Sequence, residues 1–245
     1  MTVLEDILVK LEHRKLHFTL LDPDKQEPDR AARMACAAQR AGTDAIMIGG
    51  STGYSHEDLD ATVLAIKEAC SLPVILFPTN SGLLSPHIDA IFFMSMLNSN
   101  SCDYIIREHA KAAPYIKKLG IEPISMGYLI VAPGMRVAEV GHADCVPRAD
   151  TDQAVGYAMA AEMLGMSLIY LEAGSGSPQP VPPEMVEKVV QSVSVPVISG
   201  GGITTPEHSA AAAKAGASII VTGTVVERSE HIEKALAGII QALRE

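Results

Sequence analysis

Tryptophan is absent from this chain of 245 residues, and Phe and Tyr supply only 4% of it. A core must therefore come from the aliphatic part of the 48% hydrophobic content, as helices packed on a sheet require. Basic residues are also scarce, because 19 Lys and Arg stand against 29 Asp and Glu, a formal charge of −10. Without clustered cations, the chain is not expected to bind nucleic acid.

Cysteine and long hydrophobic runs are scarce as well. The four Cys residues show neither CxxC spacing nor the density of a disulfide scaffold, which favours reduced thiols in the cytoplasm. The most apolar run, residues 88–97, has roughly half the length of a membrane span. The first residues are acidic where a secretory signal would be basic, so we expect an amphipathic helix there and a soluble, cytoplasmic protein.

Metal-binding histidine motifs are missing too. The histidines are dispersed without HxH or HExxH spacing, so a zinc site is not expected. We interpret them, His17 included, as surface or capping groups.

What the chain does contain is an alternation of β-rich runs and Ala-rich amphipathic segments, which is typical of βα units. The length suits one (β/α)8 barrel, which takes ~250 residues. We therefore predict an α/β fold, a single TIM barrel over residues 1–245 with room for irregular replacements of some helices. The strands are predicted at 17–21, 45–48, 74–77, 90–94, 124–130, 168–171, 195–199 and 219–222, and the helices at 30–41, 57–69, 152–164, 183–192, 206–215 and 229–243.

Two stretches, 95–120 and 132–151, interrupt this alternation. Loops of that length on a barrel commonly form lids, interfaces or walls of a substrate channel, and the sequence leaves these three open.

Three of the predicted strands end in small residues that would leave backbone N–H groups accessible. In a parallel barrel such turns lie at the C-terminal rim, where the loops after the late strands commonly bind phosphate. Tight turns that bind nothing are the alternative. The chain has neither GxxxxGK[ST] nor an early GxGxxG, so a nucleotide is not favoured. We predict a site for a small phosphorylated metabolite at 173–176, 200–202 and 223–224.

The first predicted strand ends in Leu-Asp-Pro-Asp-Lys, which places the carboxylate of Asp22 at the same rim. Carboxylates there can bind Mg2+, which prefers oxygen ligands and usually shares them with substrate phosphates. Ser51, in the Gly-Gly-Ser-Thr-Gly turn after the neighbouring strand, could join Asp22 around one cation. The alternatives are an Asx-Pro turn at Asp22 and a flexible Gly/Ser connection at Ser51.

Glu172 closes the sixth predicted strand within the phosphate-binding turns. A carboxylate beside a phosphate would repel it unless it faced a neighbouring hydroxyl, so we interpret Glu172 as an acceptor or general base for an alcohol. Tyr170, close before it, could bind phosphate through its hydroxyl. A solvated rim glutamate, and a tyrosine packed between barrel and helices, are the alternatives.

Taken together, these motifs resemble the geranylgeranylglyceryl phosphate synthase family. The match runs in order across nearly the whole chain, and its most specific part is the motif after the sixth strand. The region 127–134 is more similar to archaeal members than to the bacterial heptaprenyl enzymes. The motifs are Leu-Asp-Pro-Asp-Lys at 21–25, Ile-Gly-Gly-Ser at 48–51, Leu-Asn-Ser at 97–99, Tyr-Leu-Glu-Ala-Gly-Ser-Gly at 170–176 and Gly-Gly-Gly-Ile at 200–203.

The resemblance implies a Mg2+-dependent prenyltransferase that joins sn-glycerol 1-phosphate to geranylgeranyl diphosphate, forming the first ether bond of archaeal membrane lipids. Asp22 and Ser51 match the Mg2+ positions, with Asp22 and Glu172 as the catalytic residues. It also implies a homo-oligomer, dimer or hexamer, and transient contact with the membrane surface. The positions that match the glycerol-phosphate site are Tyr170, Leu171, Glu172, Ala173, Gly174, Ser175, Gly176, Gly201, Gly202, Gly223 and Thr224.

Two other functions stay open on the residues alone. One is a sugar-phosphate isomerase or aldolase, which needs a Schiff-base lysine or an acid/base pair at strand ends, where no lysine is obvious. The other is a barrel that binds a phosphorylated ligand without turnover. The length of a prenyl chain would depend on which side chain closes the end of its groove, and Tyr104 and Tyr115 are the candidates.

Overall fold

The computed structural model describes residues 1–49 and 54–245. In this part of the chain, eight parallel strands pair in chain order and the last returns to the first, which closes a barrel. The strands are β1 (Leu16–Leu21), β2 (Ala45–Ile48), β3 (Val74–Leu76), β4 (Ala90–Met96), β5 (Glu122–Ile130), β6 (Leu168–Glu172), β7 (Val197–Gly200) and β8 (Ile219–Thr222). The predicted TIM barrel is confirmed.

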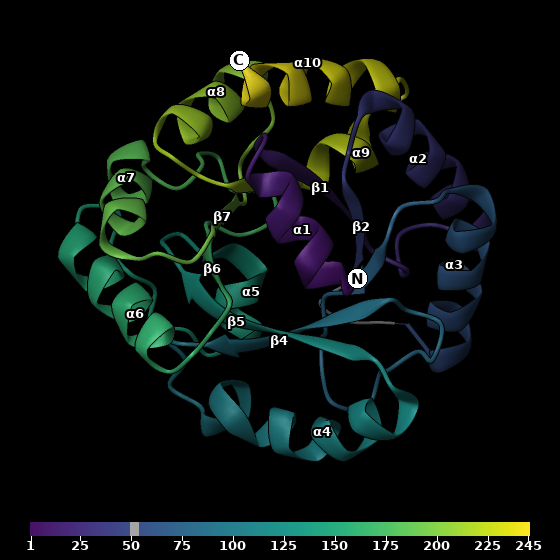
Figure 1. Ribbon diagram of the computed structural model, residues 1–245, viewed down its shortest axis with the longest axis horizontal. Coiled ribbons are helices and arrows are strands. Elements are labelled where there is room, and N and C mark those ends of the chain that lie inside the picture. The colour runs from purple at the N-terminus through teal and green to yellow at the C-terminus, as the bar shows by residue number, and fades with distance from the viewer. Residues whose placement is uncertain (50–53) are drawn as a thin grey trace.

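Helices lie around the barrel and over its two ends, and most of them form an outer ring (Figure 1). They are α1 (Val3–Leu11), α2 (Pro28–Ala41), α3 (His56–Ala69), α4 (Glu108–Leu119), α5 (Met135–Val140), α6 (Thr151–Met163), α7 (Pro183–Ser192), α8 (Pro206–Lys214), α9 (Thr224–Arg228) and α10 (Ile232–Arg244), with a π-helical turn η1 (Asp103–Arg107) before α4. None of the helices in the described ranges is long and apolar enough to cross a membrane.

The structure differs from the predicted alternation in two places. The segment 77–89 between β3 and β4, all of it described, contains no helix, so one helix is replaced by irregular chain. The stretch 95–120, predicted as an interruption, instead ends in η1 and α4. Pro114 lies inside α4 and hides it in the sequence, because proline removes an N–H from the helical ladder.

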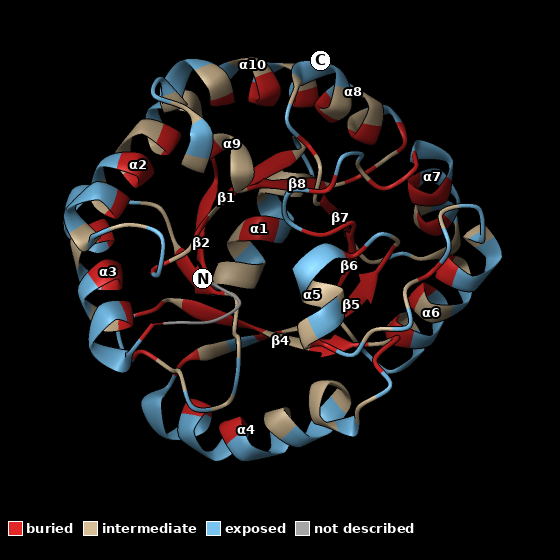
Figure 2. Ribbon diagram, turned by 180° about the vertical axis from the view of Figure 1, so that it is seen from behind, coloured by how far each residue is buried: buried red, intermediate tan, exposed pale blue. Residues whose placement is uncertain are grey.

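Alternation along each strand sorts side chains into two apolar layers. On β1, Leu16 and Phe18 point into the barrel and belong to the same buried cluster as Tyr128 and Tyr170, whereas Leu21 points outward to the helices. Figure 2 shows the strands as almost continuously buried and the helices as exposed on their outer faces. The barrel interior is thus a packed core, and a ligand must bind at one of its ends.

Helix α1 closes the N-terminal end of the barrel. The backbone N–H groups of Val3 and Leu4 donate to the carboxylate of Glu122, at the start of β5, over 2.6 and 2.9 Å. Ile7 of the same helix packs on the interior core. Figure 1 shows α1 across this end of the barrel, and Figure 2, the view from behind, shows α5 beside the opposite end. The C-terminal rim is therefore the end that remains for a ligand.

Candidate active site

The turns after β6, β7 and β8 meet around one cavity of about 420 Å³ at the C-terminal rim, which we call the phosphate pocket. Ser175 Oγ lies 3.4 Å from Thr224 Oγ1, which joins the first turn to the third. Small side chains leave the backbone of these turns open to a ligand, as an anion site requires. The pocket is lined by Leu20, Tyr170, Glu172, Ser175, Gly176, Gly201, Gly202, Ile203, Thr204, Val221, Thr222, Gly223 and Thr224.

The triplet Gly200-Gly201-Gly202 consists of glycines because neighbouring atoms occupy the space that a Cβ would need at each position. A Cβ at Gly200 would collide with the Tyr170 hydroxyl, and one at Gly201 with the Glu172 carboxylate. Gly202 has a φ of +72°, and a Cβ there would lie 2.6 Å from the backbone of Gln179. The triplet therefore allows Tyr170 and Glu172 to pack directly against the backbone of this turn.

Glu172 is 7% exposed and occupies the floor of the phosphate pocket. Its Oε1 accepts from the Gly174 N–H at 2.6 Å, and the hydroxyls of Tyr170 and Tyr128 also donate to it. Burial raises the pKa of Glu172, while these three hydrogen bonds oppose the rise. The result is an oriented carboxylate more basic than an exposed glutamate, as a general base for an alcohol requires.

Tyr170 belongs to an aromatic cluster inside the barrel, so its packing against the outer helices does not occur. Its ring centroid lies 5.2 Å from that of Tyr128, and Phe77 lies 5.4 Å from Tyr128. The hydroxyl of Tyr170 donates to Glu172 and lines the phosphate pocket. This places it at the floor of the pocket, next to any bound ligand.

Not every residue of the β6 motif faces the pocket. The side chains of Leu171 and Ala173 point outward into the core between barrel and helices. The N–H of Gly174 donates to Glu172, and a Cβ at Gly174 would collide with the backbone of Gly134. Leu171, Ala173 and Gly174 therefore support the shape of the pocket from behind.

Asp22 directly follows β1 and lines a second cavity, the mouth, of about 840 Å³. Its side chain is 13% exposed and pairs with Lys25 at 2.5 Å, and Lys25 also pairs with Glu227 of α9 at 2.7 Å. Burial raises the pKa of Asp22 from 3.8 to about 6, with Glu227 and Asp24 adding to the rise and Lys25 opposing it. The carboxylate is thus incompletely neutralised and suited to a further cation.

The described residues supply only one of the two predicted protein donors for Mg2+. Among residues 1–49 and 54–245 no three His, Cys, Asp or Glu side chains gather into a metal site. Mg2+ is usually held by one or two carboxylates together with substrate phosphates, so Asp22 at the mouth is a sufficient protein donor. Ser51, predicted as the second donor, lies outside the described residues.

An apolar cavity of about 570 Å³, which we call the groove, extends from the mouth beneath α4. The groove and the mouth share Pro78, Thr79, Met94, Met96, Tyr104 and Tyr128, so they are continuous. Helix α4 buries only Ala112 and Ile116, and the small Ala112 leaves space beneath it. The predicted interruption at 95–120 thus forms a wall of this channel. Tyr104 lines both cavities, whereas Tyr115 is 62% exposed on the outer face of α4.

Two residues that line the mouth, Tyr128 and Arg136, are not predicted as site residues from the sequence. Tyr128 lies in the region 127–134 that resembles archaeal members, but only its inward position on β5 indicates a role at the site, and Arg136 of α5 follows shortly after that region. None of the ion pairs in the described ranges involves Arg136. Arg136 therefore brings a cation to the mouth that lies within reach of a ligand and forms no ion pair in the described part of the chain.

Known proteins match this chain over nearly its whole length. A model of the PcrB family matches residues 9–243. A geranylgeranylglyceryl phosphate synthase from Thermococcus kodakarensis is 54% identical over 92% of this chain and 90% of its own length. One from Thermoplasma acidophilum is 48% identical over 100% of this chain and 97% of its own.

Solved structures match in the same way. The crystal structure of (S)-3-O-geranylgeranylglyceryl phosphate synthase from Thermoplasma acidophilum in complex with substrate sn-glycerol-1-phosphate superposes with a TM-score of 0.98, at 48% identity, over 100% of this chain and 99% of that one. A thiamine phosphate pyrophosphorylase from Pyrococcus furiosus superposes with a TM-score of 0.62 at 15% identity, over 95% of this chain and 97% of that one, which shows the shared fold alone.

Proposed function

The chain belongs to the PcrB family, and from this membership and the geometry of the rim we propose that it transfers a geranylgeranyl group to sn-glycerol 1-phosphate. The bond from prenyl C1 to the diphosphate oxygen breaks, and a bond from C1 to the 3-hydroxyl oxygen of the glycerol forms. The observation that carries the proposal is that Glu172 and Ser175 line both the phosphate pocket and the mouth of the apolar groove. A polar and a lipid substrate can therefore meet at one carboxylate.

The phosphate pocket binds the glycerol phosphate. The open backbone of its turns, with the Ser175 and Thr224 hydroxyls, receives the phosphate, and Glu172 accepts from the attacking hydroxyl. As the new C–O bond forms, that hydroxyl becomes acidic and its proton passes to the Glu172 carboxylate. Tyr170 and Tyr128 keep the carboxylate in place through their hydrogen bonds. Orientation of the two substrates supplies much of the rate.

The mouth holds the diphosphate end of the prenyl substrate. Asp22 would hold Mg2+ there, with Ser51 as the second donor of the proposal, and a bound Mg2+ neutralises charge on a leaving diphosphate. The groove accepts the prenyl chain along Met94, Tyr104 and Ile116 and excludes water from it.

Arg136 supplies a cation to the mouth from the chain itself, so Arg136→Ala is expected to raise the KM for the prenyl diphosphate about tenfold. A tenfold change corresponds to the lower end of the free energy that a hydrogen bond to a charged group contributes. We expect the lower end because the Arg136 side chain is exposed. Steady-state kinetics with each substrate varied in turn measure it. Arg40→Ala, which removes an exposed arginine paired with Glu233 on the outer helices, is the matched control. An unchanged KM would place the diphosphate away from α5.

The turn after β8 offers a clean test of the phosphate pocket. Gly223 has 3.5 Å of clearance to Leu20 for an added Cβ, whereas at Gly202 a side chain would strike the backbone of Gln179. Gly223→Ala should therefore fold normally and raise the KM for glycerol phosphate, because the methyl group narrows the approach to the backbone. Gly202→Val, in contrast, is expected to distort the turn and lose stability. If Gly223→Ala keeps the native KM for glycerol phosphate, the turn after β8 does not bind the phosphate.

Lys25 argues against the aldolase alternative. A Schiff-base lysine must be neutral to react. Burial lowers the pKa of Lys25, but its hydrogen bonds to Asp22 and Glu227 outweigh burial and leave the pKa raised. The amine is held as an ammonium group.

The proposed function is tested by incubating the protein with radiolabelled sn-glycerol 1-phosphate and prenyl diphosphates of increasing length. We expect a product that extracts into organic solvent, formed with geranylgeranyl diphosphate and with one glycerol-phosphate enantiomer. Binding of the glycerol phosphate without turnover would support the non-catalytic barrel instead.

We also propose a cytoplasmic homo-oligomer that touches the membrane surface transiently to exchange its lipid. Apolar side chains are exposed on α4 and at the end of α6, including Tyr115 at 62% and Met163 at 79%. Light scattering after size-exclusion chromatography is expected to give a dimer or hexamer. Flotation with lipid vesicles tests the membrane contact.

A further inference from the structure

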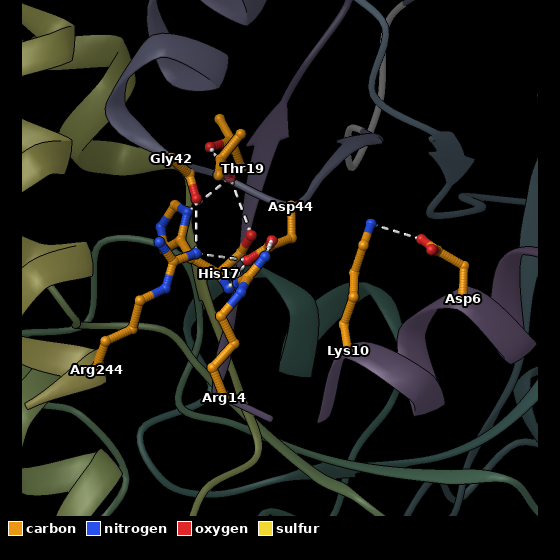
Figure 3. A network of polar contacts seen from close by, with 9 residues as sticks. Asp6, Lys10, Arg14, His17, Thr19, Gly42, Asp44 and Arg244 are labelled. Atoms are coloured by element: carbon orange, nitrogen blue, oxygen red, sulfur yellow. Dashed lines mark hydrogen bonds and ion pairs between the residues drawn. The ribbon is translucent and has the colours of Figure 1, made fainter. Parts of the chain in front are cut away.

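A chain of buried polar side chains runs along the outer face of β1, between the barrel and its helices. At the N-terminal end of this strand, Arg14 and Arg244 donate to the carboxylate of Asp44 at 2.6 and 3.0 Å. Figure 3 shows both guanidinium groups converging on it beside His17. Asp44 also accepts from the backbone N–H of His17 at 3.0 Å. These contacts anchor the backbone of His17.

The His17 ring is fully buried, so its interpretation as a surface or capping group is wrong. Nδ1 lies 2.7 Å from Thr43 Oγ1, and Nε2 lies 2.9 Å from Thr222 Oγ1. Burial lowers the pKa of His17 to about 3. The ring is therefore neutral at physiological pH and carries one N–H, whose position depends on its partners.

The hydroxyl of Thr43 decides which nitrogen carries the proton. It donates its single hydrogen to the carbonyl oxygen of His17 at 3.0 Å. Its two lone pairs then accept, one from Thr19 Oγ1 at 3.0 Å and the other from His17 Nδ1. Nδ1 therefore holds the hydrogen and Nε2 is the acceptor. The Thr222 hydroxyl must donate to Nε2, which fixes the rotamer of Thr222.

Thr222 connects this network to the phosphate pocket. It is the last residue of β8 and lines the pocket together with Gly223 and Thr224. Val221 points into the barrel, so strand alternation turns the Thr222 side chain outward, toward His17. The hydrogen bond to His17 therefore holds Thr222 on the face of β8 that points away from the barrel interior, while the end of β8 lines the pocket.

We propose that His17 is a positioning residue for the phosphate pocket, because it fixes the end of β8 and the following turn through the Thr222 hydroxyl. The inference rests on the proposed function, which supplies glycerol phosphate as the ligand. The contact lies away from the reacting carbon and serves the bound substrate and the transition state alike. Its loss should therefore raise Kd and KM for glycerol phosphate and leave kcat nearly unchanged.

Two amide substitutions separate the two bonds of the ring. Glutamine places its terminal amide near the position of Nε2, so His17→Gln can still accept from Thr222. Asparagine places its amide near Nδ1, so His17→Asn keeps the contact with Thr43 and loses Thr222. If His17 only stabilises the fold, both variants should lower Tm and neither should change the Kd for glycerol phosphate.

The measurements are calorimetric titration with sn-glycerol 1-phosphate and steady-state kinetics. We expect His17→Asn to raise Kd and KM about 3- to 10-fold, the range for one lost hydrogen bond, with kcat within about twofold. His17→Gln should recover most of the affinity. Thr222→Val removes the same bond from the other side, so the double variant with His17→Asn should bind no more weakly than the weaker single variant. If His17→Asn does not fold, Thr222→Val against Thr222→Ser, which keeps the hydroxyl, gives the same comparison.

Ser209→Ala is the control for lost stability, because it removes a buried hydroxyl that donates to the Ile239 carbonyl at 2.7 Å. It should lower Tm and leave Kd unchanged. The inference is overturned if His17→Asn and Thr222→Val lower Tm but keep the native Kd, or if His17→Asn and His17→Gln weaken binding equally. Failure of the native protein to bind glycerol phosphate would contradict the proposed function, and this inference with it, so the two failures are distinguishable.

Discussion

Asp22→Asn is expected to lose most of the activity, by about 100-fold or more, while the protein stays folded. An anionic ligand beside a leaving diphosphate contributes several kcal/mol of charge stabilisation, and a neutral amide cannot replace it. The fold should tolerate the change, because burial raises the pKa of Asp22 above its ordinary 3.8 and the ionised form is the one that burial disfavours. Lys25 keeps its second partner, Glu227, at 2.7 Å.

Kinetics at increasing Mg2+ concentration, with thermal melts, measure this result. We expect the residual activity of Asp22→Asn to require more Mg2+ than the native protein does. Asp24→Asn is the matched control, since it removes an exposed carboxylate two positions away and should be nearly native. Near-normal turnover of Asp22→Asn that a chelator still abolishes would place the metal elsewhere.

The phosphate pocket can be predicted from the sequence because its signals are local. Small residues after three β-rich runs mark the turns, and a parallel barrel brings the turns after β6, β7 and β8 to one rim. Local patterns also place Glu172 and Asp22 at strand ends. They do not show which residues of a turn face the ligand. Leu171 and Ala173 point away from it because alternation and packing decide their direction.

The groove and the His17 network depend on contacts between distant segments, and these leave no local pattern. Pro114 conceals α4, and the groove beneath it is formed together with β4. His17 meets Thr222 across the seam where β8 returns to β1. A single histidine in a β-rich run gives no sign of such a partner. Because His17 and Thr222 are buried, the hydrogen bond between them holds both side chains in one arrangement.

Glu172→Gln is expected to lower kcat by ~10²-fold, the smaller end of the ~10²–10⁴ range for a lost general base. The smaller value follows because cleavage of an allylic diphosphate builds positive charge at carbon, and the attacking hydroxyl becomes acidic only as the new bond forms. Glutamine keeps the size of the side chain, and its amide oxygen can still accept from the Gly174 N–H and from one tyrosine hydroxyl, while its NH2 group can donate to the other hydroxyl once that hydroxyl turns. Binding of the glycerol phosphate should therefore be largely kept.

The same substitution should not destabilise the protein. The pKa of Glu172 is raised by burial, so its contribution to stability is full below its unfolded pKa and is lost as pH rises through the folded pKa. Burial disfavours the ionised side chain in the folded protein, and a neutral amide does not bear that cost in free energy of folding. The Tm of Glu172→Gln at neutral pH is expected to equal or exceed that of the native protein, as is common where an active site is kept at the expense of stability.

The pH profile then separates a base from a side chain that only positions the glycerol. If Glu172 takes up the proton, kcat/KM of the native protein falls in acid with an apparent pKa above the ordinary 4.5 of a glutamate, and this acidic limb disappears in Glu172→Gln. If the carboxylate only positions the hydroxyls, the loss lies mainly in KM. Glu207→Gln, an exposed carboxylate on the first turn of α8, controls for a change of charge. Native kcat and KM in both Glu172→Gln and Glu172→Ala would remove Glu172 from the reaction.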